Sequence, residues 1–415
     1  MRRKNHVDVL CFLISPWIGF LINILTNRSE TRPFIYLIFF TLFGYSFSFS
    51  FDSADSVRYA KSFAYFDNDL SYNSLLGKYR DGELRDLYRL LLFYFTSFFS
   101  KNPKVLFALA GLIYGLFSLL IFNIFVKLKN DNNNYFTFIL GLIFYTYISF
   151  SQINGFRFWT GGLFLFYSMY NVIMEDKILW LLGLSITPLF HYSFIPVIPI
   201  MIVFYVALKI FKRYFFINRL LYGLFIISFI LSWFLNVNSI KIDSLISEDL
   251  LDGEVGNRLK YVNSTDVAEL IDKRAESSLF LSIKEYFDAL KKIYIFIFFV
   301  YFRNYLVKIS LLDSYFGKLH SLTLFMVSFS FIAISFPSGG RFMNLSNLFF
   351  ILLFLKFYNL LEFKIIKRFI LLGGLVFSFD TLFVNVLTPF LLVDIKFWIY
   401  NIFWIVLSGL DFIIK

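Results

Sequence analysis

The 415-residue chain has few of the residues that metal and redox chemistry use. Its one cysteine, Cys11, allows neither an internal disulfide nor a cysteine metal cluster, and only 3 histidines occur. The sequence has no P-loop, no Gly-x-Ser-x-Gly elbow, no His-Glu-x-x-His pair and no nucleotide-binding βαβ pattern. These absences argue against the common nucleotide-dependent and metal-dependent enzymes.

Charge is also scarce, and apolar residues are in excess. Charged residues make up 16% of the chain, against 59% hydrophobic and 22% aromatic residues, which is more than one soluble core of this length can bury. Long apolar runs recur from residue 7 to residue 414, and a transmembrane helix needs about 20 such residues. Since a bilayer offers no partner for unpaired backbone groups, the sequence predicts an all-α, polytopic integral membrane protein. Its substrate is then delivered by the membrane or is a solute that crosses it.

We predict about 13 transmembrane helices in a single transmembrane domain, residues 1–415. The expected spans are residues 7–25, 33–51, 104–126, 135–153, 156–174, 178–191, 193–211, 217–235, 293–309, 320–336, 342–361, 369–392 and 397–414. Residues 87–99 form a shorter apolar stretch that suits an interfacial or re-entrant helix as well as a span. The basic N-terminus resembles a signal peptide, but no small-residue cleavage site follows, so residues 7–25 are expected to be a retained first helix.

Two polar segments interrupt the apolar pattern. They are residues 52–89, with a short amphipathic helix, and residues 236–292, a long loop with recurring aliphatic residues and no proline. The chain has a net charge of +11, and most of its lysines and arginines stand in short loops between apolar runs. This distribution indicates membrane topology, and no nucleic-acid partner is expected. Under the positive-inside rule, the cytoplasmic loops are those with Lys127, Lys177, Lys209, Lys308 and Lys364. Both polar segments are then extracytoplasmic.

The N-terminus conflicts with this topology. Arg2, Arg3 and Lys4 favour a cytoplasmic N-terminus. With 13 crossings and residues 52–89 outside, however, that terminus would lie outside as well. The positive-inside rule therefore gives a consistent topology only for the C-terminal half of the chain.

The segment Asp52-Ser-Ala-Asp55-Ser-Val-Arg58-Tyr59 places acid, base and hydroxyl groups where a hydrophobic helix ends. At a low-dielectric boundary, Asp55 could deprotonate a sugar hydroxyl while Arg58 and Tyr59 bind the substrate. The alternative is a simple ion pair of Asp55 with Arg58 at a helix end.

The next polar group leads into residues 87–99. Glu83, Arg85 and Arg89 would lie near one helical face, as a substrate-facing cluster or as an ordinary solvated helix start.

Asn154-Gly-Phe-Arg157 stands at the head of a middle span. A helix N-terminus offers free N–H groups and partial positive charge, and an arginine adds a fork that suits phosphate oxygens. The sequence therefore predicts a pyrophosphate site. The alternative is that Arg157 snorkels while Gly161 and Gly162 let helices pack closely.

His191 stands in a polar break flanked by Pro188 and Pro196, which predicts a broken helix that lines a cavity. Imidazole titrates near neutral pH, so His191 could act as a general base or bind a phosphate or sugar. The alternative is a structural hydrogen bond.

The run Pro337-Ser-Gly-Gly-Arg341 also feeds an arginine into the first turn of a helix, although the same run can form an ordinary tight loop. Asp380, in the middle of a span, needs a partner or marks an ion path, and Arg303 is expected to snorkel.

Together these residues resemble a known family, the EpsG-like and Wzy-type polymerases of bacterial O-antigen, capsule and exopolysaccharide synthesis. The shared features are Asp-x-x-x-Tyr (Asp55 to Tyr59), a polar lead into a short apolar helix (Glu83 to Tyr88), Asn-x-x-Arg (Asn154 to Arg157) and His-x-Ser (His191 to Ser193). Their order and spacing cover about the first half of the chain. Ser53 and Ala54 replace the glycine that usually precedes the aspartate.

The resemblance implies transfer of a growing glycan from undecaprenyl diphosphate to a lipid-linked repeat unit, on the outer face of the bacterial inner (cytoplasmic) membrane. Arg157 and Arg341 would bind the donor diphosphate, with Arg58 as a third candidate. The base would be His191 or Asp55, with His191 preferred because it lies on the same predicted side as Arg157.

The remaining expected substrate-binding residues are Asn154, Tyr59, Glu83 and Arg85. No metal or other cofactor is expected, since arginines can stabilise the leaving charge. The expected partners are the undecaprenyl-diphosphate-linked oligosaccharide and the lipid bilayer, with a chain-length regulator and a flippase as further candidates.

Two alternative functions remain open at this point. A lipid-linked oligosaccharide flippase or other transporter would explain Asp380 and the broken helices without catalysis, although no repeated halves are visible. An O-antigen ligase would differ only in its acceptor.

Overall fold

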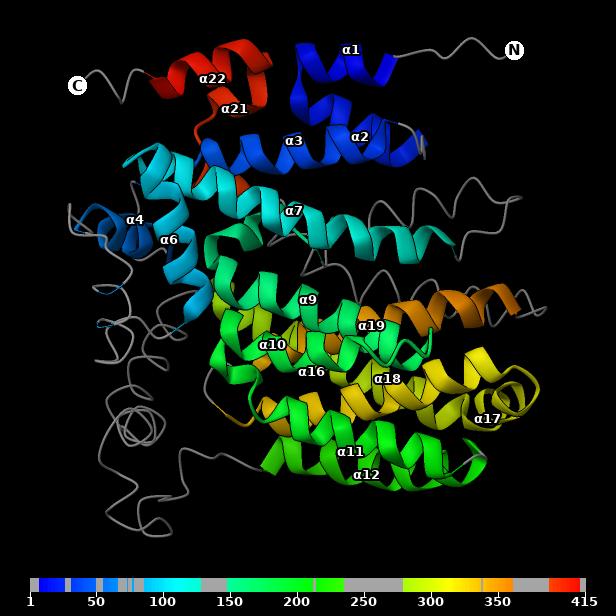
Figure 1. Ribbon diagram of the computed structural model, residues 1–415. Helices are drawn as coiled ribbons and strands as arrows, with labels where there is room; N and C mark the ends of the chain where they lie inside the picture. The colour runs from blue at the N-terminus through cyan, green and yellow to red at the C-terminus, as the bar shows by residue number, and fades with distance from the viewer. Residues whose placement is uncertain are drawn as a thin grey trace. The chain divides into compact units, whose positions relative to one another are not determined.

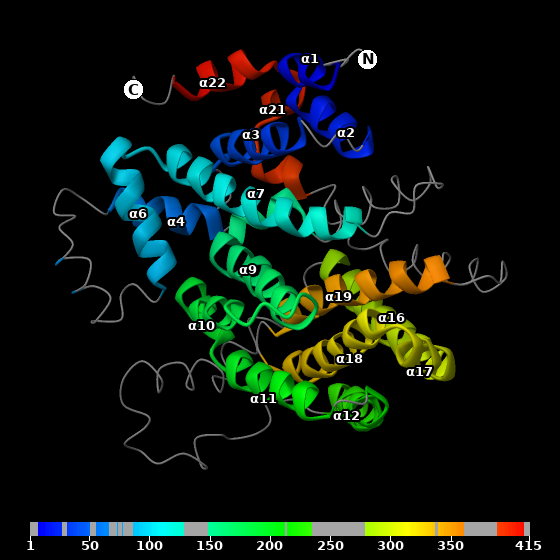
Figure 2. The same cartoon turned by 45° about the vertical axis from the view of Figure 1, so that its right-hand side comes forward.

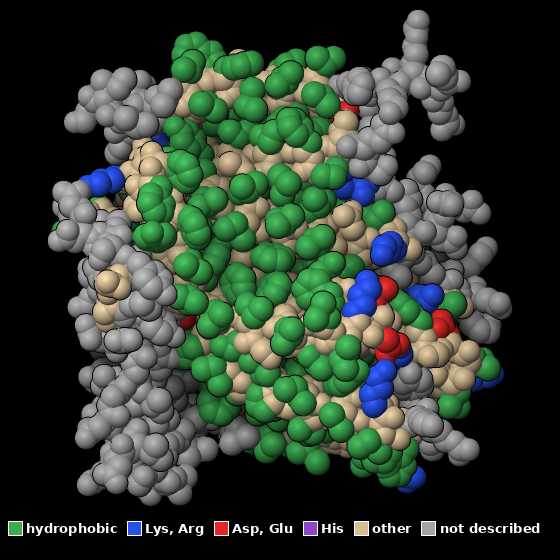
Figure 3. Space-filling model, in the orientation of Figure 1, with side chains coloured by type: hydrophobic (Ala, Val, Ile, Leu, Met, Phe, Trp, Pro, Cys, Tyr) green, Lys and Arg blue, Asp and Glu red, His purple; other side chains and the backbone are tan. Residues whose placement is uncertain are grey.

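The structure is a computed structural model that describes residues 7–26, 31–49, 55–65, 73, 77, 86–127, 148–211, 214–234, 279–336, 339–360 and 388–410. All regular elements in these ranges are helices, apart from an isolated bridge between Phe47 and Val393. Five of these helices are long and apolar enough to cross a membrane, or six if a bent pair counts as one span. Hydrophobic side chains cover most of the described surface in Figure 3. The predicted helical membrane protein is confirmed, and the full number of 13 crossings stays a prediction.

The chain packs as two compact units, which are described separately: unit 1 is Met1–Met201 with Thr381–Lys415, and unit 2 is Ile202–Asp380. The helices of unit 1 (Figure 1) are α1 (Val7–Ile14), α2 (Pro16–Thr26), α3 (Arg32–Tyr45), α4 (Asp55–Ala64), α6 (Leu87–Phe99), α7 (Pro103–Lys127), the 3-10 helix η1 (Phe150–Gly155), α9 (Phe156–Ile173), α10 (Trp180–Phe190), the 3-10 helix η2 (Tyr192–Phe194), α21 (Lys396–Ile399) and α22 (Ile402–Leu410). Helix α11 (Val197–Ile210) runs from unit 1 into unit 2, which also contains α12 (Tyr214–Phe234), α16 (Leu279–Tyr301), α17 (Arg303–Leu312), α18 (Ser314–Ala333) and α19 (Gly340–Leu360).

An antiparallel pair, α3 and α7, forms the core of unit 1. Helix α3 buries Tyr36 and Phe40 completely. Near the end of α3, a Cβ on Gly44 would lie 2.0 Å from the carbonyl oxygen of Phe107, near the start of α7. Farther along, a Cβ on Gly111 would lie 2.2 Å from the carbonyl oxygen of Phe40. Glycines at these points let the two backbones touch, as is common between membrane helices.

This pairing also bears on α6. Because α3 ends where α7 begins, the chain between them leaves and returns at the same end of the pair. Helix α6 has 13 residues, so it is about 20 Å long, which is less than the roughly 30 Å of a bilayer core. Figures 1 and 2 both show it steeply inclined to α7. A short, inclined helix suits the interfacial or re-entrant alternative for residues 87–99, which stays a prediction.

Helices α9 and α10 bring further polar residues to this end. Helix α9 runs in the direction of α7, because Phe156 contacts Phe107 near the start of both (5.8 Å between ring centroids) and Phe164 contacts Phe117 farther along (5.1 Å). Helix α10 runs back, since Gly161 near the start of α9 faces the last residue of α10. The end of α3, the start of α9 and the end of α10 therefore share one end of unit 1.

Two predicted single spans of unit 1 are broken helices. Residues 7–25 form α1 and α2, separated at Ser15, where Pro16 lacks the N–H that would continue the first helix. Residues 397–414 contain α21 and α22, separated at Tyr400 and Asn401. The side chain of Asn401 accepts a hydrogen bond from the N–H of Trp404 (3.0 Å), and so it caps a new helix.

The ninth predicted span, residues 293–309, is also wrong as a single helix. It runs from α16 into α17, and these two helices are bent by 62°. Helix α16 begins at Leu279, so residues 279–292 of the predicted long loop 236–292 are helical. The rest of that loop lies outside the described residues.

Candidate functional site

The candidate site lies where α9 begins. The 3-10 helix η1 turns the chain into α9, with Gly155 at the N-cap and Arg157 as the second helical residue. A Cβ on Gly155 would lie 3.3 Å from the ring of Trp159 and 3.7 Å from Oδ2 of Asp55. The first residue of α4, Asp55, therefore lies beside the N-terminus of α9.

Two residues from other segments hold the Arg157 side chain. Its Nε–H donates to the hydroxyl of Tyr59 (2.8 Å), and its guanidinium carbon lies 5.0 Å from the centroid of that ring. Its Nη1 forms an ion pair with Oδ2 of Asp86, just before α6. The Asp86 side chain is 0% exposed and that of Arg157 is 20% exposed. A buried carboxylate thus fixes a guanidinium that still reaches solvent.

Tyr59 keeps its proton at ordinary pH. Burial raises the pKa of Tyr59 above its usual value, and the nearby charge of Arg157 opposes this rise only in part. The neutral hydroxyl accepts from Arg157 and can donate its own proton to a second group. Tyr59 can therefore link the arginine to a bound oxygen.

Asp55 and Arg58 form an ion pair one turn apart on α4. Their side chains are 24% and 70% exposed, so water screens the pair and little energy is needed to separate it. This is the pairing that the alternative interpretation of the sequence expected. It does not rule out chemistry, because an anionic ligand can compete for so exposed an arginine.

Asn154 holds the start of α4. Its Oδ1 accepts the backbone N–H of Ser56 (2.8 Å), one of the N–H groups that a helix leaves unpaired in its first turn. Asn154 was predicted to bind substrate. Its amide oxygen is instead used to position α4, and with it Asp55, against the start of α9.

His191 lies between α10 and η2, at the same end of unit 1. Its Nδ1 accepts the backbone N–H of Ser193 (3.3 Å) and lies 2.8 Å from the Ser193 hydroxyl. Its ring contacts Phe158, the residue after Arg157, at 5.4 Å between centroids. Because Nδ1 accepts a hydrogen bond, the proton of the neutral ring is on Nε2, which is then a donor.

The remaining predicted residues belong to unit 2 or lie outside the described residues. Arg341 is the second residue of α19 and is half-buried, but it belongs to unit 2, so its meeting with Arg157 stays a prediction. Glu83, Arg85 and Asp380 lie outside the described residues.

Asp86 and the Ser56 hydroxyl were not singled out from the sequence. The signal for Asp86 was an acidic residue directly before an apolar helix, a place where a buried carboxylate needs a cation. The Ser56 hydroxyl is buried and has no hydrogen-bond partner among the described residues. No sequence signal marked it.

A second polar cluster surrounds His320 in unit 2. His320 is fully buried, with Tyr222 (3.1 Å to Nε2), Ser310 (2.9 Å to Nδ1) and Asn218 (3.4 Å to Nδ1) around its ring. Arg303, which was expected to snorkel, lies over the Tyr222 ring at 5.2 Å. Both nitrogens of the imidazole have partners, so this cluster is a packed structural network.

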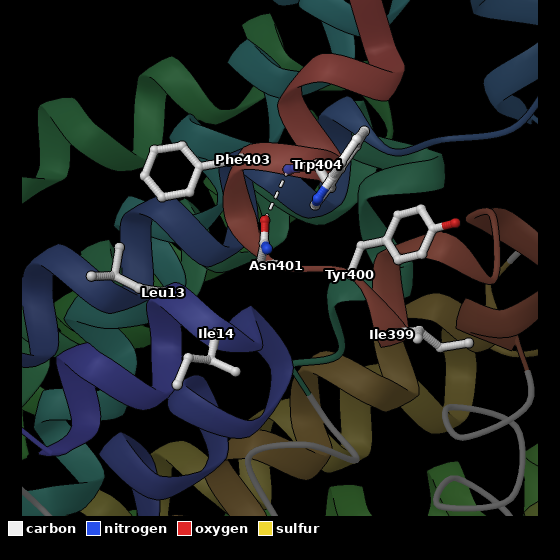
Figure 4. Close-up of a pocket in the computed structure, with 7 residues that line it drawn as sticks. All are labelled: Leu13, Ile14, Ile399, Tyr400, Asn401, Phe403 and Trp404. Atoms are coloured by element: carbon white, nitrogen blue, oxygen red, sulfur yellow. Dashed lines mark hydrogen bonds between the residues drawn. The ribbon is translucent and has the colours of Figure 1, made fainter.

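Unit 1 also has an apolar hollow of about 660 Å³ (Figure 4). It lies between the end of α1 and the break between α21 and α22. Its lining residues are Leu13, Ile14, Ile399, Tyr400, Asn401, Phe403 and Trp404. No charged side chain lines it, so it does not suit a diphosphate. Among the described residues, no three His, Cys, Asp or Glu side chains lie close enough together to hold a metal ion.

No protein-family model matches this chain, and no curated protein and no solved structure matches it. Its chemistry is therefore assigned from its own residues, above all the group of Arg157, Asp86, Tyr59, Asp55 and Arg58 at one end of unit 1.

Proposed function

We propose that this chain is a polysaccharide polymerase of the bacterial cytoplasmic membrane. It transfers a growing glycan from undecaprenyl diphosphate to a hydroxyl of a lipid-linked repeat unit, on the face outside the cytoplasm. The observation that supports this most is Arg157, presented in the first turn of α9 and held there by the buried Asp86. A fixed guanidinium at a helix N-terminus is suited to a diphosphate.

The donor diphosphate binds at the start of α9. Arg157 has five N–H groups, of which Tyr59 and Asp86 each accept one. The others can bind phosphate oxygens, and the partial positive charge at the start of α9 favours the anion there. Arg58 adds a second cation within unit 1.

In the transfer step, the acceptor hydroxyl oxygen attacks the anomeric carbon of the donor sugar. The bond from that carbon to the diphosphate oxygen breaks, and the diphosphate leaves with the electron pair, stabilised by the arginines. The hydroxyl proton passes to a base. We assign this base to Asp55, whose carboxylate is released when its partner Arg58 turns to the diphosphate.

His191 suits a binding role better than the base role that the sequence favoured. With Nδ1 accepting the N–H of Ser193, its Nε2–H is a donor to a phosphate or sugar oxygen. The change of base from His191 to Asp55 follows from this tautomer.

The test is complementation of a strain that lacks this gene, scored by the ladder of glycan chain lengths. Arg157→Ala should abolish the ladder while single repeat units still reach the cell surface. The matched control is Lys177→Ala, which removes an exposed cation beyond the other end of α9 and should leave the ladder unchanged.

Two results would replace the proposal. If repeat units accumulate on the cytoplasmic side, the protein is a flippase. If full-length chains form but stay on their lipid carrier, it is a ligase.

A further inference from the structure

Helices α1 and α2 fold back on each other as an antiparallel hairpin. Asn23, near the end of α2, donates from Nδ2 to Oδ2 of Asp8, near the start of α1 (2.9 Å), and the Asp8 side chain is fully buried. Closer to the turn, a Cβ on Gly19 would lie 2.3 Å from both the N and the Cα of Phe12. The two pairs, 8 with 23 and 12 with 19, are centred on the same point of the chain, between Ser15 and Pro16.

Neither arm is long enough to cross a bilayer. Helix α1 has 8 residues and α2 has 11, so they are about 12 Å and 16 Å long. A bilayer core is roughly 30 Å thick. Continuous helix over residues 7–26 would cross it, but the folded pair reaches only about halfway.

The turn of the hairpin is suited to hydrocarbon. The N–H of Ser15 donates to the carbonyl of Cys11 (2.8 Å), and the carbonyl of Ser15 accepts the N–H of Gly19 (3.0 Å). Pro16 has no N–H to satisfy. Because the backbone groups of Ser15 are paired at the turn, this non-helical point can lie inside a membrane without a large cost.

The open end of the hairpin lies at the start of α3. The Thr31 hydroxyl, one residue before α3, donates to Asp8, and Asn23 Nδ2 lies 3.0 Å from the same hydroxyl oxygen. Arg32 at the start of α3 in turn reaches Asn123 near the end of α7 (3.5 Å). Both ends of the hairpin are therefore at the end of unit 1 where α7 finishes.

We infer that residues 7–26 form a re-entrant hairpin, clasped by Asp8 and Asn23, that enters and leaves the membrane on one side. The N-terminus then shares a side with Lys127 and lies opposite the Arg157 site. The conflict between Arg2, Arg3 and Lys4 and an odd number of crossings disappears, because the first predicted span does not cross. This inference is independent of the proposed function.

The first test uses single cysteines in a Cys11→Ser background and a membrane-impermeant maleimide. In intact cells, Asn5→Cys and Lys127→Cys should give the same labelling result and Lys61→Cys on α4 the opposite one, and all three should label after the membrane is opened. If Asn5→Cys labels together with Lys61→Cys and opposite to Lys127→Cys, the segment crosses the membrane and the inference is wrong.

The second test is a cross-link across the clasp. Asp8→Cys with Asn23→Cys, again in Cys11→Ser, should form a disulfide on mild oxidation, seen as loss of maleimide-polymer labelling on a gel. In a continuous helix these positions would be roughly 22 Å apart, far beyond the reach of a disulfide. The control pair is Asp8→Cys with Ile18→Cys, which should not cross-link. Absence of a disulfide in the first pair, or equal cross-linking of both pairs, would overturn the hairpin.

Discussion

Arg157 and Asp86 form an ion pair across 71 positions of the chain, between the first turn of α9 and the residue that precedes α6. The carboxylate is fully buried, whereas the guanidinium is partly exposed. The buried Asp86 therefore fixes the position of the Arg157 guanidinium, which is exposed enough to contact a ligand. This asymmetry supports a binding role for Arg157 and a supporting role for Asp86.

Removal of Arg157 alone should destabilise the protein. Arg157→Leu removes the ion pair from the buried Asp86, so we expect the free energy of unfolding in detergent to fall by about 3–5 kcal/mol. In Arg157→Leu with Asp86→Leu, most of that loss should be recovered, because the buried carboxylate is removed together with its Arg157 partner. Neither variant should make glycan chains. Equal destabilisation of the single and double variants would show that the ion pair has no such role.

Variants of Asp55 and Arg58 should separate the affinity for the donor from the turnover rate. With purified protein, Asp55→Asn should keep its affinity for an undecaprenyl-diphosphate-linked donor and lose turnover by at least about 100-fold, since it lacks the base. Arg58→Ala should instead weaken donor binding by about tenfold, because a charge-assisted hydrogen bond is lost. Full turnover in Asp55→Asn would assign the base to another residue.

The role of His191 can be tested with glutamine. The amide N–H of glutamine can donate from a position near the imidazole Nε2, but it cannot take up a proton. We expect His191→Gln to keep most of the turnover and His191→Ala to lose about tenfold. If His191→Gln loses as much turnover as His191→Ala, and its residual activity no longer falls at acid pH, His191 is the base after all.

Tyr59→Phe should show the effect of the hydroxyl on Arg157. The ring contact with Arg157 stays, but the hydrogen bond is lost, so donor affinity should fall by about tenfold.

The difference in unfolding free energy between the wild-type protein and Tyr59→Phe should also depend on pH. Since burial raises the pKa of Tyr59 in the folded state, the unfolded chain ionises first above pH 10, and wild-type stability should fall there relative to Tyr59→Phe. Parallel stability curves for the two proteins from pH 8 to pH 11 would contradict the raised pKa.

Two glycines allow a matched test of the α3–α7 pair. A Cβ at Gly44 would meet the Phe107 carbonyl oxygen at 2.0 Å, so we expect Gly44→Ala to lower the free energy of unfolding by about 1–3 kcal/mol. Gly223, in α12, has nothing within 4 Å, so Gly223→Ala should be neutral or stabilising by up to about 1 kcal/mol. The measurement is unfolding in detergent. Similar effects in both variants would mean that α3 and α7 do not approach as closely as described.

The helices that the sequence predicted best are those whose apolar runs are uninterrupted. Residues 104–126 and 156–174 correspond closely to α7 and α9, because length and hydropathy alone select a helix in a bilayer. The run 7–25 is also long and apolar, but it is broken at Pro16. Hydropathy cannot predict whether a proline kinks a helix or reverses the chain, because that depends on contacts such as the hydrogen bond from Asn23 to Asp8.

Local motifs identified several polar residues of the site without identifying their partners. Arg157, Asn154, Asp55 and His191 could be picked out because each stands where an apolar run begins or ends. Pairing of Arg157 with Asp86, and of Asn154 with the start of α4, could not be predicted, because each joins segments that are far apart in the chain.

Composition and the long apolar runs were enough to predict a helical membrane protein, because a helix pairs its backbone groups within one segment where the bilayer offers no partner. The reversal at Ser15 and the tautomer of His191 depended on packing. Each rests on a few long-range or turn contacts, Asp8 with Asn23 and His191 with Ser193. For that reason, the chemical groups of the site could be read from the chain, whereas their arrangement came from the folded protein.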